Sequence, residues 1–234
     1  MPPKAILFDL DDTIISFDSH TKQTWEKICK DFTEKYNLFP YKKLFNSINE
    51  IASWYWSDEE RHRIGRLNPK QTRRNIVISA LEKLNCNDIK FGMEIADNYS
   101  DLHEKMITLF PNALETIQKF SKMGIKLGLL TNGNSKMQNA KINKFNLASY
   151  FEICLVEEEL GFGKPDKRVF KIALEKLNVK SKDAWMVGDN LIWDIQGAQA
   201  SGIFAIWNDF ANKGLPENSK IIPDRIINNI SELL

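Results

Sequence analysis

"AILFDLDDTI", residues 5–14, begins as an apolar run and then presents three carboxylates, Asp9, Asp11 and Asp12. The apolar half is typical of a strand that is buried on both faces of a parallel sheet. Side chains alternate along a strand, so we expect Asp9 and Asp11 to point to the same side. Two carboxylates this close repel each other unless they share a proton or a cation lies between them. The stretch therefore predicts a buried strand whose carboxyl end binds either a proton or a metal ion.

Similar short apolar runs recur along the chain, and segments with helical spacing separate them. The runs are "AILFDL" (5–10), "IKLGLL" (125–130), "FEICLV" (151–156), "AWMVGD" (184–189) and "IFAIW" (203–207). This alternation predicts an α/β fold, a doubly wound parallel sheet of the Rossmann-like kind with helices on both faces. Ligands of such sheets bind beyond the carboxyl ends of the strands.

Roughly 110 residues separate the first run from the second, far more than one crossover connection needs. Within this insertion, "HTKQTWEKICKDFTEKYN" (20–37) and "PKQTRRNIVISALEKLN" (69–85) have apolar positions at helical spacing. We therefore expect a core formed by residues 1–16 and 108–234, with a helical second domain, residues 17–107, placed over the strand ends.

Composition restricts the class of protein further. Of 234 residues, 43% are hydrophobic and 27% charged, which is ordinary for a globular protein. The net charge of +1 gives no overall field that would attract nucleic acid or an anionic membrane. The apolar runs are strand-sized, and acids interrupt the N-terminus before a signal-peptide core is complete. We expect a cytoplasmic protein, with a monomer and a dimer both compatible with the sequence.

Cys29, Cys86 and Cys154 are odd in number and far apart. They support neither a disulfide framework nor a zinc site, and buried thiols are the simpler interpretation. His20, His62 and His103 show no spacing typical of metal ligands either.

The other predicted strand ends carry groups that complement the acids. "LLTNG" places Thr131 at the end of its strand, and Asn132 and Gly133 follow with backbone N–H groups for an anion. "GKP" offers Lys164 just ahead of a helix. "MVGDNLIWD" places Asp189 directly after a strand, where Gly188 relaxes the turn, and Asp194 about one helical turn later. Oxygen ligands without His or Cys favour a hard cation, and together these groups are typical of phosphate and Mg²⁺ binding.

Four stretches resemble, in order, the motifs of the haloacid dehalogenase superfamily. They are "DLDDT" (9–13), "LLTNG" (129–133), "GKPDKRVF" (163–170) and "GDNLIWD" (188–194). Members share a doubly wound core with a mobile cap, and the long helical insertion resembles the first cap class. Through "TNG" and "MVGDNLIWDIQG", the chain is also similar to N-acylneuraminate-9-phosphatase and to the pyrimidine 5'-nucleotidase-like phosphatases.

The resemblance implies a role for each matching residue. Asp9 would be the nucleophile that forms an aspartyl-phosphate, and Asp11 would protonate the leaving alcohol and then activate water. Thr131 and the Asn132 backbone would bind phosphate oxygens, and Lys164 would offset charge on Asp9 and the phosphoryl group. The dehalogenases lack an acid at the position of Asp11 because a halide leaves without a proton, so Asp11 favours phosphate ester chemistry.

The resemblance also implies a metal site. Asp9, the Asp11 carbonyl and Asp189 would bind Mg²⁺, while Asp194 would orient Lys164 or a metal-bound water. Gly133 and Thr13 are supporting positions, and Asp12 is interpreted as a local hydrogen-bonding residue.

The expected function is Mg²⁺-dependent hydrolysis of a small phosphorylated metabolite, a sugar phosphate or a nucleoside monophosphate. A phosphomutase of the β-phosphoglucomutase kind would use the same residues and stays open. A receiver-like phosphoacceptor module is less favoured, because receivers carry the acid pair and the phosphorylated Asp on different strands. A binding protein that has lost catalysis is disfavoured because every expected catalytic position is filled.

Two further stretches have more than one interpretation. "SWYWSDEERHRIGRLNPKQTRR" (53–74) is either a substrate-receiving cap surface or an aromatic core beside a solvated basic face, and we favour the second. If substrate binds there, Trp54, Arg63 and Arg66 are the candidates. The acidic run Glu157–Glu159 is interpreted as a solvated turn near the site.

Overall fold

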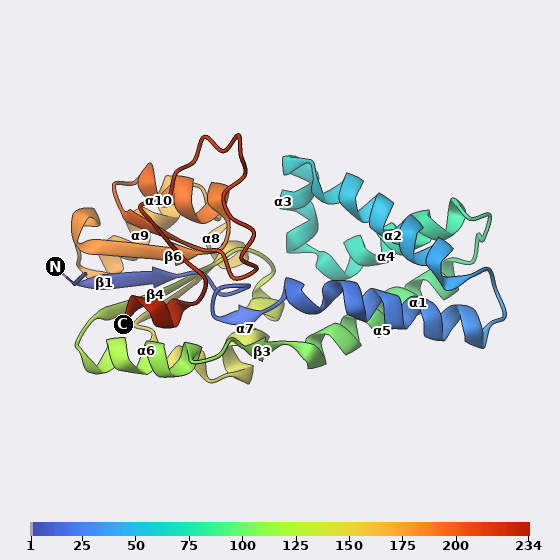
Figure 1. Ribbon diagram of the computed structural model, residues 1–234, viewed down its shortest axis with the longest axis horizontal. Coiled ribbons are helices and arrows are strands. Elements are labelled where there is room, and N and C mark those ends of the chain that lie inside the picture. Colours follow the sequence, from blue (N-terminus) through green and yellow to red (C-terminus); the bar gives the residue numbers. More distant parts are fainter. Residues whose placement is uncertain (1) are drawn as a thin grey trace. The chain divides into compact units, whose positions relative to one another are not determined.

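The computed structural model describes residues 2–234, which form two units (Figure 1). The first comprises residues up to 17 together with 108–234, and the second is formed by residues 18–107. The chain leaves and re-enters the first unit through an antiparallel ribbon of β2 (Ile15–Ser16) and β3 (Thr108–Leu109). The hydroxyls of Ser16 and Thr108 lie 3.1 Å apart across this ribbon. The ribbon thus joins the two points at which the insertion interrupts the core.

A six-stranded parallel sheet, with the strand order β5-β4-β1-β6-β7-β8, lies at the centre of the first unit (Figure 1). Its strands are β1 (Ala5–Phe8), β4 (Lys126–Thr131), β5 (Ile153–Val156), β6 (Ala184–Gly188), β7 (Phe204–Asn208) and β8 (Arg225–Ile227). Five of these strands, β1, β4, β5, β6 and β7, overlap the five apolar runs and confirm that these runs form strands. The edge strand β8 escaped prediction because it has only three residues, two of them exposed.

Helices cover both faces of this sheet, with α6 on one face and α9 and α10 on the other (Figure 1). The α-helices are α6 (Ala113–Lys122), α7 (Ser135–Lys144), α8 (Glu157–Leu160), α9 (Lys167–Leu177) and α10 (Gly197–Gln199). The 3-10 turns are Leu147–Tyr150, Ser181–Asp183 and Ile230–Leu233, and a π-helical turn spans Leu191–Gln196. Side chains at the helix starts fix the register: Asn134 caps α7, and Asp166 caps α9.

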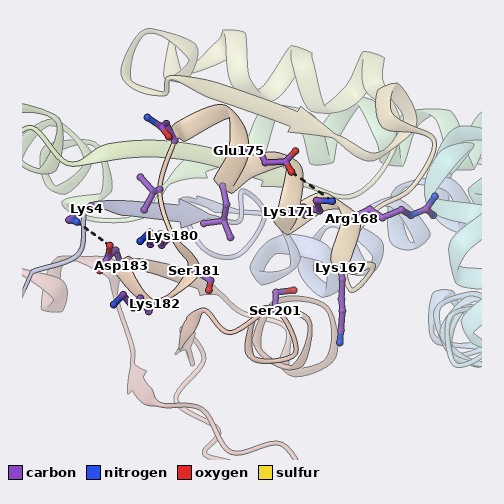
Figure 2. A pocket seen from close by; sticks show the side chains of 13 residues that line it. Lys4, Lys167, Arg168, Lys171, Glu175, Lys180, Ser181, Lys182, Asp183 and Ser201 are labelled. Carbon is purple, nitrogen blue, oxygen red and sulfur yellow. Dashed lines mark hydrogen bonds and ion pairs between the residues drawn. The ribbon is translucent and has the colours of Figure 1, made fainter.

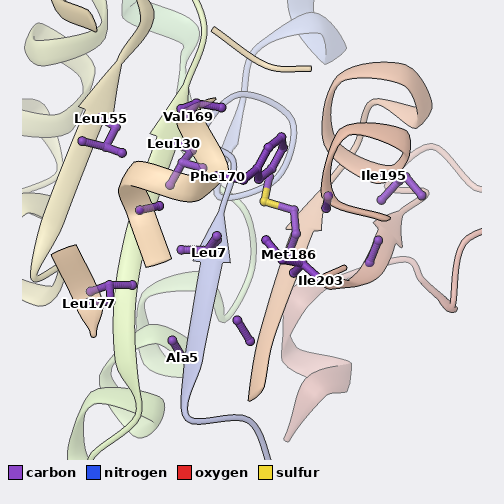
Figure 3. Close-up of a cluster of buried hydrophobic side chains, with 14 of the residues drawn as sticks. Ala5, Leu7, Leu130, Leu155, Val169, Phe170, Leu177, Met186, Ile195 and Ile203 are labelled. Atoms are coloured by element: carbon purple, nitrogen blue, oxygen red, sulfur yellow. The ribbon is translucent and has the colours of Figure 1, made fainter. Parts of the chain in front are cut away.

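An apolar core lies between the sheet and α9. Leu7 and Leu130 from neighbouring strands meet Phe170 of α9, and all three are completely buried. Figure 3 shows the side chains of Phe170 and Met186 pointing toward each other above β1 and β6. Burying large aliphatic and aromatic side chains contributes roughly 1.5–3 kcal/mol each, which makes this layer a rigid base for the strand ends.

The second unit contains only helices. They are α1 (Thr21–Lys35), α2 (Tyr41–Trp56), α3 (Glu59–Leu67), α4 (Pro69–Glu82) and α5 (Ile89–Met106), with a 3-10 turn at Asp18–His20. Asp58 and Asp88 accept hydrogen bonds from backbone N–H groups at the starts of α3 and α5, and Pro69 is the first residue of α4. The sequence therefore marks each of these starts locally.

The helices of the second unit share an apolar core of their own. Leu44 and Ile48 of α2, Val77 of α4 and Ile95 of α5 are completely buried there. Trp25 and Tyr99 stack with ring centroids 3.8 Å apart. Among residues 2–234, no helix is long and apolar enough to cross a membrane.

Candidate active site

Three neighbouring strands of the sheet bring the predicted acids and hydroxyl to one edge. Asp9 directly follows β1, Thr131 is the last residue of β4, and Asp189 directly follows β6. The strands are parallel and β1 lies between the other two, so their carboxyl ends lie side by side. The Asp9 N–H still donates to the Val187 carbonyl at 2.9 Å. Asp9 is therefore held by the ladder, although it stands just beyond the strand.

Lys164 lies between two carboxylates. Its Nζ atom is 2.5 Å from Oδ1 of Asp9 and 2.6 Å from Oδ1 of Asp194. The Lys164 and Asp194 side chains are each 2% exposed, and that of Asp9 is 11% exposed. Both contacts are charge-assisted and shielded from water, which makes them stronger than surface ion pairs.

The backbone of Lys164 is also fixed. The Asn132 side chain accepts a hydrogen bond from the Lys164 N–H at 2.8 Å and donates one to the Lys164 carbonyl at 2.7 Å. This amide ties the loop ahead of α9 to the end of β4. Sequence reasoning expected only the backbone of Asn132 to contribute, and its side chain has this additional structural role.

Burial and charge act on the ionisation of this group of residues. Burial raises the pKa of Asp9 to about 7, because it outweighs the lowering by the adjacent Lys164, and the charge of Asp194 raises the pKa further. Burial, together with the charges of Asp9 and Asp194, also raises the pKa of Asp189 well above its usual range. Burial lowers the pKa of Lys164, but the carboxylates of Asp194 and Asp9 outweigh it and raise the pKa overall. Lys164 is therefore a permanent cation at neutral pH.

Carboxylate oxygens of Asp9, Asp189 and Asp194 all lie within 4.8 Å of one another. When ionised, these three acids and the Lys164 ammonium carry a net charge of −2, which one divalent cation would neutralise. An all-oxygen donor set is the kind that Mg²⁺ prefers. The residues present therefore fit a magnesium ion.

Gly188 has a different role from the one predicted. It does not have the positive φ angle that a glycine-dependent turn requires. Instead, a Cβ atom at this position would lie 2.3 Å from the carboxyl group of Asp194. A side chain is excluded here because Asp194 closely approaches the backbone at the end of β6.

Asp11 turns toward α7, where two residues that sequence reasoning missed bind it. Nζ of Lys141 lies 2.8 Å from both carboxylate oxygens of Asp11, and Nε2 of Gln138 lies 3.0 Å from one of them. The same Gln138 amide donates to the Thr131 hydroxyl. A sequence feature could have identified these two residues. Gln138 and Lys141 are three positions apart on a helix and lie beside the apolar Ile142, which places both on a buried face.

The backbone N–H of Gly133 already has a partner within the protein. It donates to Oε2 of Glu157 at 2.8 Å, and Glu157 is buried. The acidic run forms the short helix α8 and not a turn, and its first residue is buried and directed at the loop after β4, while Glu158 and Glu159 are exposed as predicted. Glu158 and Glu159 accept hydrogen bonds from Ser135 at the start of α7. The run fixes the loop that follows Thr131.

The remaining residues of the first motif are buried and local. Oδ1 of Asp12 accepts a hydrogen bond from the Phe17 N–H at 2.9 Å, and Asp12 adopts a left-handed φ of 57°. The buried hydroxyl of Thr13 makes no hydrogen bond within residues 2–234. Asp12 thus has the local hydrogen bond expected of it.

Candidates in the helical unit have partners of their own. Trp54 is exposed, and the Arg61 guanidinium lies 4.0 Å from its ring centroid. Arg63 forms an exposed ion pair with Glu60 at 2.6 Å, and Arg66 lies 3.4 Å from Nδ1 of His62. These contacts describe an aromatic and basic surface of α2 and α3, and a substrate role for Trp54, Arg63 and Arg66 stays a prediction.

A cavity of about 880 Å³ lies at the opposite edge of the sheet (Figure 2). It is bordered by Lys4, which precedes β1, and by Asp183, which precedes β6, and these two form an ion pair at 3.1 Å. Lys171 and Glu175 of α9 also line it and lie 3.8 Å apart. None of the predicted site residues borders this cavity, so the chemistry of the acid cluster identifies the candidate active site.

Comparisons with known proteins identify the family of the chain. The sequence model of the haloacid dehalogenase-like hydrolases matches residues 3–202. A phosphoserine phosphatase from Thermus thermophilus is 37% identical over 126 residues, which are 53% of this chain and 49% of that protein. A glyceraldehyde 3-phosphate phosphatase from Methanopyrus kandleri is 26% identical over 99% of this chain and 95% of its own length. A pyrimidine 5'-nucleotidase from Escherichia coli is 26% identical over 97% of this chain and 95% of its own length.

Solved structures share the same fold. A hydrolase of the same superfamily from Bacillus subtilis superposes with a TM-score of 0.74 at 23% identity, covering 100% of this chain and 97% of that one. A 2-haloacid dehalogenase from Pseudomonas syringae has a TM-score of 0.64 at 29% identity and covers 100% and 96%. Since the family model spans most of the sequence and the four motifs converge at one sheet edge, the chain belongs to the haloacid dehalogenase-like hydrolase family.

Proposed function

We propose that this hydrolase is a Mg²⁺-dependent phosphatase that cleaves a small phosphorylated metabolite through an aspartyl-phosphate on Asp9. One observation carries the proposal: the Asp9 carboxylate is paired with buried Lys164 at 2.5 Å and followed two residues later by a second acid, Asp11. Esters need an acid for the leaving alcohol, whereas halides do not. The presence of Asp11 therefore favours phosphate esters over haloacids as substrates.

The first step is transfer of the phosphoryl group to Asp9. A carboxylate oxygen of Asp9 attacks phosphorus, the bond from phosphorus to the ester oxygen breaks, and the departing oxygen takes a proton from the Asp11 carboxyl group. Proton transfer of this kind typically accelerates a reaction about 10²–10⁴-fold. Lys164 holds the attacking carboxylate and places a positive charge beside the phosphoryl oxygens, while the Thr131 hydroxyl binds one of them.

The second step is hydrolysis of the aspartyl-phosphate. A water molecule gives a proton to the Asp11 carboxylate and attacks phosphorus, the bond between phosphorus and the Asp9 oxygen breaks, and inorganic phosphate leaves. Asp11 regains in this step the proton that it lost in the first. Covalent catalysis splits one difficult displacement into two easier ones.

Asp9, Asp189 and the Asp11 carbonyl would hold Mg²⁺ in this scheme, with Asp194 at the same cluster. The ion would supply positive charge against the repulsion between the anionic carboxylate and the anionic phosphate. The three clustered carboxylates carry more negative charge than the Lys164 ammonium neutralises, and this excess supports the binding of a divalent cation.

The curated relatives are named for three different small phosphate esters: phosphoserine, glyceraldehyde 3-phosphate and pyrimidine nucleotides. A test should therefore cover all three, together with sugar phosphates and p-nitrophenyl phosphate. We expect release of inorganic phosphate from one class, dependent on added Mg²⁺ and abolished by a chelator.

Asp9→Asn is the decisive variant, because an amide cannot form the acyl phosphate that a carboxylate forms. We expect it to fold and to lose turnover, whereas Asp183→Asn, a change at the opposite edge of the sheet, should retain it. Phosphate release by Asp9→Asn at the wild-type rate would contradict the assignment. Accumulation of an isomeric phosphate ester without inorganic phosphate would indicate a phosphomutase instead.

A further inference from the structure

Lys141 is a buried cation for which the proposed chemistry has no role. Its side chain is 7% exposed, and its Nζ atom has four partners. Both carboxylate oxygens of Asp11 and Oε1 of Gln138 lie at 2.8 Å, and the centroid of the Phe17 ring lies at 3.9 Å. An ammonium with this many close partners has little freedom to move.

Gln138 extends this arrangement to the phosphate-binding hydroxyl. Its Nε2 group donates both to Asp11, at 3.0 Å, and to the Thr131 hydroxyl, while its Oε1 accepts from Lys141. A primary amide has two donors and one acceptor group, and all are used here. Gln138 and Thr131 are each 3% exposed, so water does not compete for these bonds.

We propose that Lys141 and Gln138 are positioning residues for acid–base catalysis: they fix the plane of the Asp11 carboxyl group and tie it to the Thr131 hydroxyl. The inference rests on the proposed function, which gives Asp11 the proton transfer and Thr131 a phosphate oxygen. Neither α7 residue needs to touch the substrate in this scheme. Lys141 and Gln138 instead hold Asp11 in one orientation, and Gln138 links it to the Thr131 hydroxyl.

The physical reason is that Asp11 lies beyond the strands of the main sheet, where its backbone forms an isolated β-bridge to Ile15 but no ladder fixes its side chain. β1 ends at Phe8, and Asp11 stands three residues further on, beside Asp12 with its left-handed backbone. Its side chain is 25% exposed, so hydrogen bonds and an ion pair are needed to fix the orientation of its carboxyl group. Proton transfer requires the carboxyl oxygen within hydrogen-bond reach of the leaving oxygen, and small displacements of a catalytic group lower rates strongly.

Lys141→Met tests the inference, because methionine keeps the length of the side chain and removes its charge. The readout is kcat/KM for two esters that the wild-type protein cleaves: an alkyl phosphate and p-nitrophenyl phosphate. The alkoxide needs a proton to leave, whereas p-nitrophenolate is a good leaving group without one. We expect kcat/KM to fall roughly ten- to hundredfold for the alkyl ester, a part of the usual acid–base contribution, and much less for p-nitrophenyl phosphate.

A purely structural role would give a different result. Loosening of α7 would lower the fraction of active protein and reduce kcat/KM for both esters by the same factor. Lys141→Arg, which restores a cation able to bind both Asp11 oxygens, should recover part of the loss for the alkyl ester. Lys136→Met changes an exposed lysine on the same helix and should leave both values unchanged.

Equal losses for the two esters, or unchanged kcat/KM in Lys141→Met, would overturn the inference. The Asp11→Asn variant separates this failure from failure of the proposed function. If Asp11→Asn loses activity toward the alkyl ester while Lys141→Met does not, Asp11 is the acid and needs no help from α7. If Asp11→Asn itself remains fully active, the proposed chemistry is wrong and the positioning role falls with it.

Discussion

The carboxyl group of Asp194 lies directly against the backbone of Gly188, so that a Cβ atom there would stand 2.3 Å from both Cγ and Oδ2 of Asp194. Two contacts hold Asp194 in place, so its displacement would cost free energy. Its Oδ1 atom lies 2.6 Å from Nζ of Lys164, and its Oδ2 atom accepts the Asn190 N–H at 2.9 Å. The absence of a side chain at Gly188 thus permits the ion pair that fixes Lys164.

Gly188→Ala should therefore destabilise the protein and lower its activity. Inserting atoms into a tightly packed site typically costs about 1–3 kcal/mol, and here the displaced group also holds Lys164. Urea unfolding and phosphate release would measure the two effects. In an Asp194→Gly background the added methyl group no longer meets a side chain at position 194, so Gly188→Ala should then cost less. A cost that stays the same in both backgrounds would show that the clash is not with Asp194.

Lys164→Met should be among the most destabilising single changes at the site. It leaves Asp9 and Asp194 buried without their shared cation, and removing one partner of a buried ion pair typically costs about 3–5 kcal/mol. Activity should be lost as well. The matched control is Lys4→Met, since Lys4 pairs with Asp183 at 3.1 Å but its side chain is 72% exposed. Exposed pairs contribute about 0–1 kcal/mol, so equal losses of unfolding free energy in the two variants would contradict the proposed importance of Lys164.

Magnesium should stabilise the folded protein, because the carboxylates that hold it converge only in the fold. At a hundredfold excess over its dissociation constant, a ligand of the native state adds about 2.7 kcal/mol to the free energy of unfolding. Thermal unfolding with MgCl₂, and with NaCl at equal ionic strength, would detect this. Asp189→Asn removes one of the three clustered carboxylates and should reduce the increase. An identical increase in Asp189→Asn would place the ion elsewhere.

Cys29 should make the stability of the protein depend on alkaline pH. It is fully buried, and burial raises the pKa of its thiol to about 12. An unfolded cysteine ionises near pH 8.5, whereas Cys29 in the folded protein stays neutral up to about pH 12. Ionisation therefore favours the unfolded state between these two values. As far as this thiol is concerned, the folded protein has its full stability below about pH 8.5 and loses stability as pH rises toward 12. Each pH unit in this window corresponds to about 1.4 kcal/mol at most.

Unfolding free energies at about pH 8 and pH 10 would test this for wild type and Cys29→Ala, with an expected extra loss in wild type on the order of 1–2 kcal/mol. Cys86→Ala keeps the buried thiol and should follow the wild type. Parallel losses in wild type and Cys29→Ala would show that other groups account for the pH dependence.

Sequence patterns were sufficient for the architecture and for part of the site. Apolar runs of strand length identify β1, β4, β5, β6 and β7, because a strand buried on both faces must be apolar throughout. Asp9, Thr131 and Asp189 follow from the same reasoning, since parallel strands end at one edge. β8 was missed because a strand of three residues, two of them exposed, carries no periodic signal.

The sequence by itself determined which chemical groups lie at the carboxyl ends of the strands. The apolar runs identify the strands, and the residues that follow each run must lie at the same end of a parallel sheet. Only the tertiary structure decided what those groups touch. The sequence pattern suggests surface positions on polar helices for Lys141, Gln138 and Glu157, yet all three are buried. Lys141 contacts Asp11, Gln138 contacts Thr131, and Glu157 contacts Gly133. The same packing, not a turn, explains Gly188. A buried polar side chain is stable only beside a partner that the chain supplies from far away in sequence, and no local pattern specifies that partner.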